Sequence, residues 1–172
     1  REARPAASRN GIHPGATRAD HVQVHVGHTV VLEVRVGMVG VPGRLLIQVN
    51  RGVKLDQEGN VEQSSGPDGS TLKIVEVPSG KVSPLPAGKP DTAQISGHQC
   101  WAGQTGLVVF TAAPGVHESM VPGTGVYAAV PGEKAARKVA LGQPFNHLAV
   151  SDDGKYFIVD DYRTMRVHVG SL

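Results

Sequence analysis

The sequence is poor in cysteine, in aromatic side chains and in unbalanced charge, and each shortage excludes a class of protein. Cys100 is the only cysteine among 172 residues, so the fold does not depend on an internal disulfide. A net charge of +2 gives no argument for a nucleic-acid partner or a membrane-attracted surface. No apolar run approaches the roughly 18 residues of a membrane-spanning helix. We therefore expect a soluble protein and leave both cytoplasm and periplasm open as its compartment.

Glycine and proline are abundant instead, with 22 and 12 copies, and valine dominates the apolar residues. This mixture favours strands joined by many turns, and no segment has the pattern of a convincing helix. Residues 51–70 have the polar composition of an extended hairpin loop, and the prolines of residues 78–90 restrict that segment to a turn and a short edge strand. We predict strands over residues 21–26, 30–36, 44–50, 71–77, 107–113, 125–130, 138–141, 156–161 and 165–170.

The first 20 residues differ from the rest of the chain. They are rich in Arg, Ala, Pro and Gly and have no periodicity, which predicts a disordered or loosely attached tail. No apolar stretch of a signal peptide follows the basic residues. Because the sequence starts on Arg1, we interpret it as a fragment or a processed product.

An internal repeat organises residues 21–172. Val77-Pro78 and Val130-Pro131 are 53 positions apart, and His98 and His147 are 49 positions apart. Each unit consists of a strand, a turn, a short strand, a loop, a histidine, a turn and an apolar strand, with units near 71–121 and 122–172. A four-stranded unit of about 40–50 residues is the size of a β-propeller blade. The sequence therefore predicts an all-β, partial β-propeller of about three antiparallel blades, whose open sheet edges permit self-association.

Two interpretations of the paired histidines stay open. In one, His98 and His147 bond to the backbone where the chain enters a strand and serve only to fix a turn. In the other, histidines on the inner strands of neighbouring blades converge on one metal or substrate site. The spacing by itself fits both.

Residues 71–161 resemble the oligogalacturonate lyase family of β-propellers. The family motif His-x-x-Trp is matched by His98 and Trp101, and a following Ser-His-Leu with an Asp-Gly turn is matched by Asn146-His147-Leu148 and Asp153-Gly154. The resemblance covers about half of the chain and leaves the first 45 or so residues without a counterpart.

The resemblance implies β-elimination on oligogalacturonate or another small glycan. In that reaction a manganese ion neutralises the carboxylate and stabilises the enediolate, while a basic side chain takes the proton beside the carboxylate. By alignment, His147 takes the place of a metal ligand, and His98 and Trp101 lie near the sugar. The family base is an arginine, and counting back about 25 positions from His98 reaches Lys73, with Arg44 as the alternative.

The sequence departs from that family in two ways. The other metal ligands, a glutamine and a His-x-His, have no counterpart after His147, and Lys73 is not equivalent to a guanidinium base. We therefore expect neither a strong metal site nor lyase activity from these 172 residues alone. The alternatives are a non-catalytic propeller that binds protein or glycan, and a small β-sandwich in which the repeat is accidental.

Three histidines near the N-terminus form a second candidate pattern. His21, His25 and His28 have the spacing H-x3-H-x2-H. On a strand, His21 and His25 would share a face and could form a two-histidine metal site. The solvated face of an edge strand is the competing interpretation.

Overall fold

The computed structural model describes residues 21–25, 31–35, 41–51, 54–63, 69–112, 124–141, 145–161 and 164–172. Over these residues the chain is all-β and contains no helix, so no helix could cross a membrane in this part of the chain. Residues 1–20 and His28 lie outside the described residues, as do the side chains of His21 and His25. The strands are β1 (His21–His25), β2 (Val31–Arg35), β3 (Arg44–Asn50), β4 (Lys54–Leu55), β5 (Val61–Gln63), β6 (Ser70–Glu76), β7 (Val82–Pro84), β8 (Ile95–Trp101), β9 (Val108–Ala112), β10 (Gly125–Ala129), β11 (Arg137–Leu141), β12 (Phe145–Val150), β13 (Tyr156–Asp161) and β14 (Arg166–Ser171).

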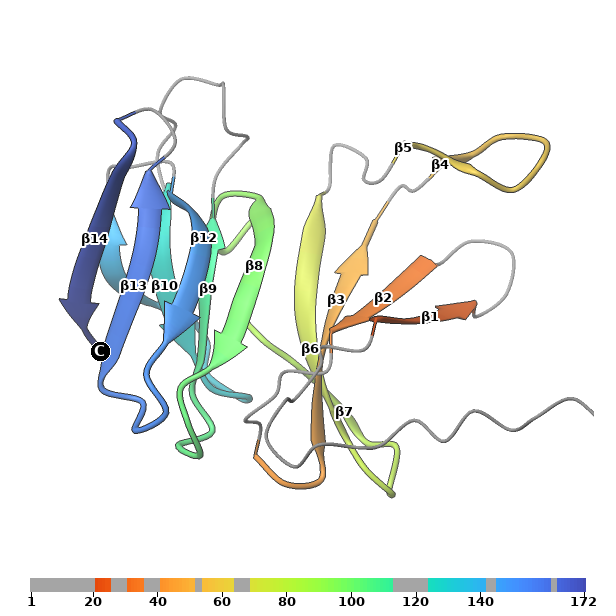
Figure 1. Ribbon diagram of the computed structural model, residues 1–172. Helices are drawn as coiled ribbons and strands as arrows, with labels where there is room; N and C mark the ends of the chain where they lie inside the picture. Colours follow the sequence, from red (N-terminus) through yellow and green to blue (C-terminus); the bar gives the residue numbers. More distant parts are fainter. Residues whose placement is uncertain are drawn as a thin grey trace, which may run out of the picture.

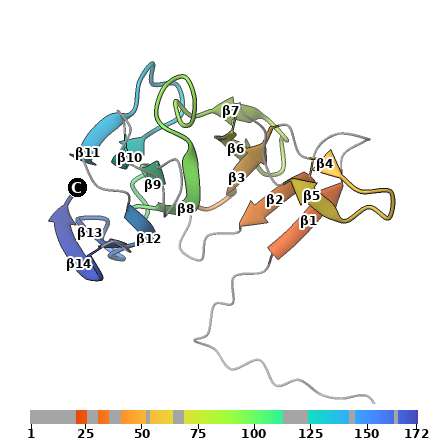
Figure 2. The same ribbon diagram turned by 90° about the horizontal axis from the view of Figure 1, so that it is seen from above.

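The strands form three larger antiparallel sheets and one small hairpin. The first sheet has the order β1-β2-β3-β6-β7, the second β11-β10-β9-β8 and the third β12-β13-β14. The hairpin β4-β5 lies inside the segment predicted as an extended loop. Figure 2 shows the second sheet lying between the first and the third, with β8 and β12 close together at one side.

The three sheets lie side by side (Figure 1), and two apolar cores hold them together. The first core lies between the first and second sheets and contains Leu72, Ile74, Trp101 and Phe110. The second core lies between the second and third sheets, and its members are Ala102, Val109, Val126, Ala128, Phe145, Phe157 and Val159. Because successive side chains on a strand point to opposite faces, β9 contributes Val108 and Phe110 to one core and Val109 to the other. The second sheet is therefore covered on both faces.

The expected strands are confirmed to within about a residue at each end, but four strands are missing from the sequence prediction. Besides the short hairpin β4-β5, these are β8 and β12, which carry His98 and His147. In both, the pairing register shifts at the histidine, so the residues around it do not alternate in the pattern that identifies a strand. The prediction found the partner strands β9 and β13 because both are continuous and apolar.

The 49-residue repeat is visible in the turns of two hairpins. In the turn between β8 and β9, the Ala102 amide donates to the Leu107 carbonyl oxygen at 2.8 Å. Between β12 and β13, the Ser151 amide donates to the Tyr156 carbonyl oxygen at 2.9 Å. Each residue of the second pair lies 49 positions after its counterpart in the first. The hairpins β8–β9 and β12–β13 are thus equivalent units of two neighbouring sheets.

Candidate functional site

His98 and His147 come together where the second and third sheets meet. His98 lies on β8 and His147 on β12, and their ring centroids are 4.7 Å apart with an angle of 62° between the ring planes. The side chain of His147 is 56% exposed, and His98 is half-buried. The structure therefore brings together two histidines that the repeat places in equivalent positions.

A β-bulge explains how each histidine is presented. On β12, Phe145 pairs with Asp161 and Leu148 pairs with Val159, so Asn146 and His147 together lie opposite the single residue Asp160. A bulge of this kind bends the strand and changes the direction of its side chains. The bulge therefore turns His147 out of the regular alternation of β12 and toward β8.

The bulge of β8 lies at the corresponding place. Ile95 pairs with Ala112 and Gln99 pairs with Phe110, so residues 96–98 lie opposite Thr111. Thr111 and Asp160 are themselves 49 positions apart. The two histidines thus lie in bulges at corresponding places of their hairpins, although the bulge of β8 contains one residue more than that of β12.

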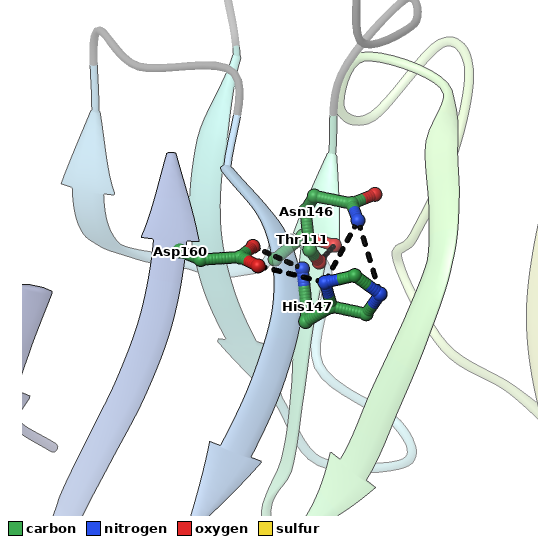
Figure 3. A network of polar contacts seen from close by, with 4 residues as sticks. All are labelled: Thr111, Asn146, His147 and Asp160. Atoms are coloured by element: carbon green, nitrogen blue, oxygen red, sulfur yellow. Dashed lines mark hydrogen bonds and ion pairs between the residues drawn. The ribbon is translucent and has the colours of Figure 1, made fainter. Parts of the chain in front are cut away.

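Asp160 holds His147 through two hydrogen bonds (Figure 3). The backbone amide of His147 donates to Asp160 Oδ1 at 2.7 Å, and His147 Nδ1 lies 2.7 Å from Asp160 Oδ2. The Asn146 amide nitrogen lies 3.1 Å from Nδ1 and 3.4 Å from Nε2 of the same ring. Because a carboxylate only accepts hydrogen bonds, Nδ1 carries the proton in this arrangement, and Nε2 is the acceptor nitrogen, with the Asn146 amide 3.4 Å away.

The electrostatics of the pair favour an ionised carboxylate. Burial raises the pKa of Asp160, but the hydrogen bonds from the His147 side chain and backbone, together with the charge of that imidazole when protonated, outweigh this effect. The pKa of Asp160 consequently lies below its usual value. Asp160 is therefore a charged partner of His147 at neutral pH.

Thr111 connects the two bulges from the second sheet. Its buried hydroxyl donates to the Asn146 carbonyl oxygen at 3.2 Å and lies 3.4 Å from the carbonyl oxygen of His98. A single side chain thereby ties the backbone of β12 to that of β8. The sequence analysis assigned no site role to Thr111, Asn146 or Asp160. The signal that could have found two of them is the repeat, because Thr111 and Asp160 are 49 positions apart, as His98 and His147 are.

The other residues singled out by sequence lie elsewhere. Trp101 is buried in the first core, on the side of β8 opposite to the contact with His147. Lys73 lies between Leu72 and Ile74, which both point into the first core, so its side chain is on the face of the first sheet turned away from the second. Arg44 lies opposite Glu76, with Nη2 3.9 Å from Glu76 Oε1. The structure therefore does not join Lys73 or Trp101 to the pair of histidines.

Cys100 follows His98 on β8 but is unsuited to nucleophilic chemistry. Burial raises the pKa of its thiol to about 12. The thiolate is the reactive form of cysteine, so this residue stays protonated and unreactive at neutral pH.

An open groove of about 240 Å³ begins at His147 and Asp160. Its floor is apolar and is formed by side chains of the third sheet, and its lining is His147, Leu148, Ala149, Ile158, Val159, Asp160 and Val167. The site thus combines one imidazole–carboxylate pair with an apolar surface beside it.

No family model matches the chain, and neither curated proteins nor solved structures give a significant match.

Proposed function

We propose that the three sheets are blades of a β-propeller resembling oligogalacturonate lyases, and that the cluster His98, Asn146, His147 and Asp160 binds an acidic glycan. The observation that carries the proposal is the approach of the His98 and His147 ring centroids to 4.7 Å from bulges at corresponding places of two neighbouring sheets. Propellers build sites in this way, from residues of successive blades that meet near the inner strands. The arrangement of the three sheets in Figure 2 is compatible with such a fan of blades.

The chemistry of the cluster fits a carboxylate-bearing sugar. Imidazole N–H groups and the Asn146 amide are hydrogen-bond donors, and a protonated imidazole also attracts a negative charge. Asp160 fixes the orientation of the His147 ring, so less freedom is lost when a ligand binds. The apolar floor of the groove offers a surface for the face of a sugar ring.

The described residues do not fit the manganese ion that the resemblance implies. No three His, Cys, Asp or Glu side chains in the described ranges are grouped so as to hold a metal ion. A catalytic ion is normally held by three protein ligands. No reaction step is therefore derived through a metal held by these residues.

Elimination on galacturonate needs a base at the carbon beside the carboxylate. The base takes the proton from this carbon, the bond between the neighbouring carbon and the glycosidic oxygen breaks, and that oxygen leaves with a proton. Lys73 lies on the far face of the first sheet, so the bases that this cluster can offer are the imidazoles of His98 and His147. A binding module without catalysis is the second candidate, since the donors of the cluster can hold an acidic sugar without any reaction.

Titration of the chain with trigalacturonate, followed by calorimetry and by amide chemical shifts, tests the proposal. We expect saturable binding that weakens by about tenfold in His147→Ala, because one charge-assisted hydrogen bond contributes roughly 1.5–3 kcal/mol. His168→Gln is the matched control, since His168 lies in the same sheet but contacts Phe145 instead of the cluster. Galactotriose, which lacks the carboxylates, should bind more weakly.

The same protein incubated with manganese and digalacturonate separates the two candidates. Ultraviolet absorbance of the unsaturated product, lost in His147→Ala, would support the lyase. Binding without product would support the non-catalytic module. Wild-type protein that binds neither galacturonate oligomer would refute both.

A further inference from the structure

The third sheet leaves one of its faces open to solvent. On the covered face, Phe157 and Val159 pack into the second core. On the other face, Ala149, Ile158 and Val169 form a row of directly paired residues, in which Ile158 is 44% and Val169 is 72% exposed. We call this surface the tail face.

The tail face has the side-chain character of a buried sheet interface. The equivalent pair in the second sheet is Val109 and Ala128, and both are 0% exposed because the third sheet covers them. Val109 and Ile158 are 49 positions apart, so the same place in the repeat is buried once and exposed once. Contiguous exposed apolar residues of this kind mark an interaction surface.

A complementary surface lies on the first sheet, at the opposite end of the molecule (Figure 1). Leu45, Val75 and Val82 form a row of directly paired residues on the face turned away from the first core. Leu45 and Val75 are half-buried, and Val82 is 52% exposed. We call this surface the head face.

The charges of the two faces are opposite and occupy matching rows. On the head face, the row beside the apolar one contains Lys73, paired with the exposed Pro84 and with Ile47, which is only 6% exposed. On the tail face, the row beside the apolar one contains Asp160, paired with Val167. On each face the charged residue lies two positions from an apolar one on the same strand, Lys73 from Val75 on β6 and Asp160 from Ile158 on β13.

We propose that a second copy of this chain docks on the tail face through its head face. The apolar rows pack against each other, and the ammonium group of Lys73 from one copy enters the groove beside Asp160 of the other. A second copy and a glycan therefore compete for this groove. Each copy presents one head and one tail, so the contact is heterologous, and two such contacts close a two-fold ring. The ring contains six large sheets, within the range of about 4–8 in which β-propellers close.

Light scattering coupled to gel filtration tests this on the purified full chain without any glycan. We expect a mass of twice the 18.0 kDa of one chain at micromolar concentration. Val169→Lys on the tail face and Val82→Lys on the head face should each raise the dimer dissociation constant by at least tenfold. Leu55→Lys is the matched control, because Leu55 is 44% exposed but lies in the separate hairpin β4-β5 and should leave the mass unchanged. Circular dichroism shows whether each variant remains folded.

Mixing the two interface variants tests the head-to-tail geometry. Chains with Val169→Lys keep an intact head face, and chains with Val82→Lys keep an intact tail face, so an equimolar mixture should recover association through one of the two contacts. A wild-type chain that stays monomeric overturns the proposal. Dimers that persist with Val82→Lys would indicate that two tail faces pair with each other, which overturns the head-to-tail contact. Open-ended polymers overturn the proposal as well, because they show that the two contacts do not close a ring.

Discussion

The hairpins β8–β9 and β12–β13 have equivalent residues 49 positions apart, and they differ most in how far their side chains are buried. Val109 is fully buried between two sheets, whereas its counterpart Ile158 is 44% exposed. Thr111 is fully buried and bonds to backbone carbonyl groups, whereas its counterpart Asp160 bonds to an exposed histidine. The same position of the hairpin thus holds the hydroxyl of Thr111 in the second sheet, which is covered on both faces. In the third sheet, which is covered on one face only, it holds the ionised carboxylate of Asp160.

The comparison also shows how a pair of repeats can build a site. Both bulges contain a histidine, but the polar residue opposite each bulge differs. Thr111 lies within hydrogen-bond distance of the backbone of both β12 and β8, whereas Asp160 accepts hydrogen bonds from His147 and orients its ring. A symmetrical pair of hairpins therefore produces an asymmetrical cluster, in which His147 has a fixed carboxylate partner.

Replacing the counterparts Val109 and Ile158 by aspartate gives the largest expected difference between the two hairpins. Val109→Asp places a charge in the second core without a partner, which destabilises a fold by about 3–5 kcal/mol. Ile158→Asp leaves the charge in water and should change the unfolding free energy of the monomer by about 0.5 kcal/mol or less. Urea denaturation at a concentration where each variant is monomeric measures both, and equal losses would contradict the difference in burial between the two positions.

The packing of the two turns predicts an intermediate effect. Gly103 has a φ of +56°, and a Cβ atom there would lie 2.5 Å from the carbonyl oxygen of Asp152 in the neighbouring turn. Gly80 has a similar φ of +70° but nothing within 4 Å of its Cβ position. Left-handed backbone alone costs an alanine roughly 1–2 kcal/mol.

We therefore expect Gly80→Ala to lower the unfolding free energy by about 1 kcal/mol and Gly103→Ala to lower it by about 2–3 kcal/mol. Thermal or urea denaturation gives the difference between the two. If the variants prove equally stable, the turns of the two hairpins are not in the contact described.

The smallest expected effects concern Thr111 and Asp160, whose contributions to the unfolding free energy should differ in their dependence on pH. Thr111→Val removes a buried hydrogen bond between neutral groups, so its loss of about 1–2 kcal/mol should not depend on pH. Asp160→Asn weakens a partly exposed ion pair, for which a loss of about 0.2–1 kcal/mol is expected. Since the pKa of Asp160 is lowered in the fold, its contribution is present above its unfolded value of 3.8 and disappears as the pH falls through the folded value.

Urea denaturation at about pH 5 and at about pH 2.5 separates the two behaviours. The difference between wild type and Asp160→Asn should shrink at the lower pH, and the difference for Thr111→Val should persist. A pH-dependent loss in Thr111→Val would mean that its effect passes through an ionisable neighbour.

The sequence by itself determined the strands that alternate or are continuously apolar, the turns between them and the repeat that makes His98 and His147 equivalent. These features depend on local pattern, because side-chain alternation and turn chemistry act over a few residues. The same reasoning correctly placed Asp153-Gly154 in a hairpin turn, where the Lys155 amide donates to Asp153 Oδ1 at 3.1 Å.

The tertiary structure decided which residues meet. Strands β8 and β12 escaped sequence reasoning because a bulge breaks their alternation, and the partnership of His147 with Asp160 follows from the same bulge. Lys73 was matched to the histidines by counting along the chain, but the face of a strand depends on its register, and that register turns Lys73 away from them. Whether Val109 or Ile158 is buried depends on which sheet covers it, and packing between sheets joins parts of the chain too distant for any local pattern to specify.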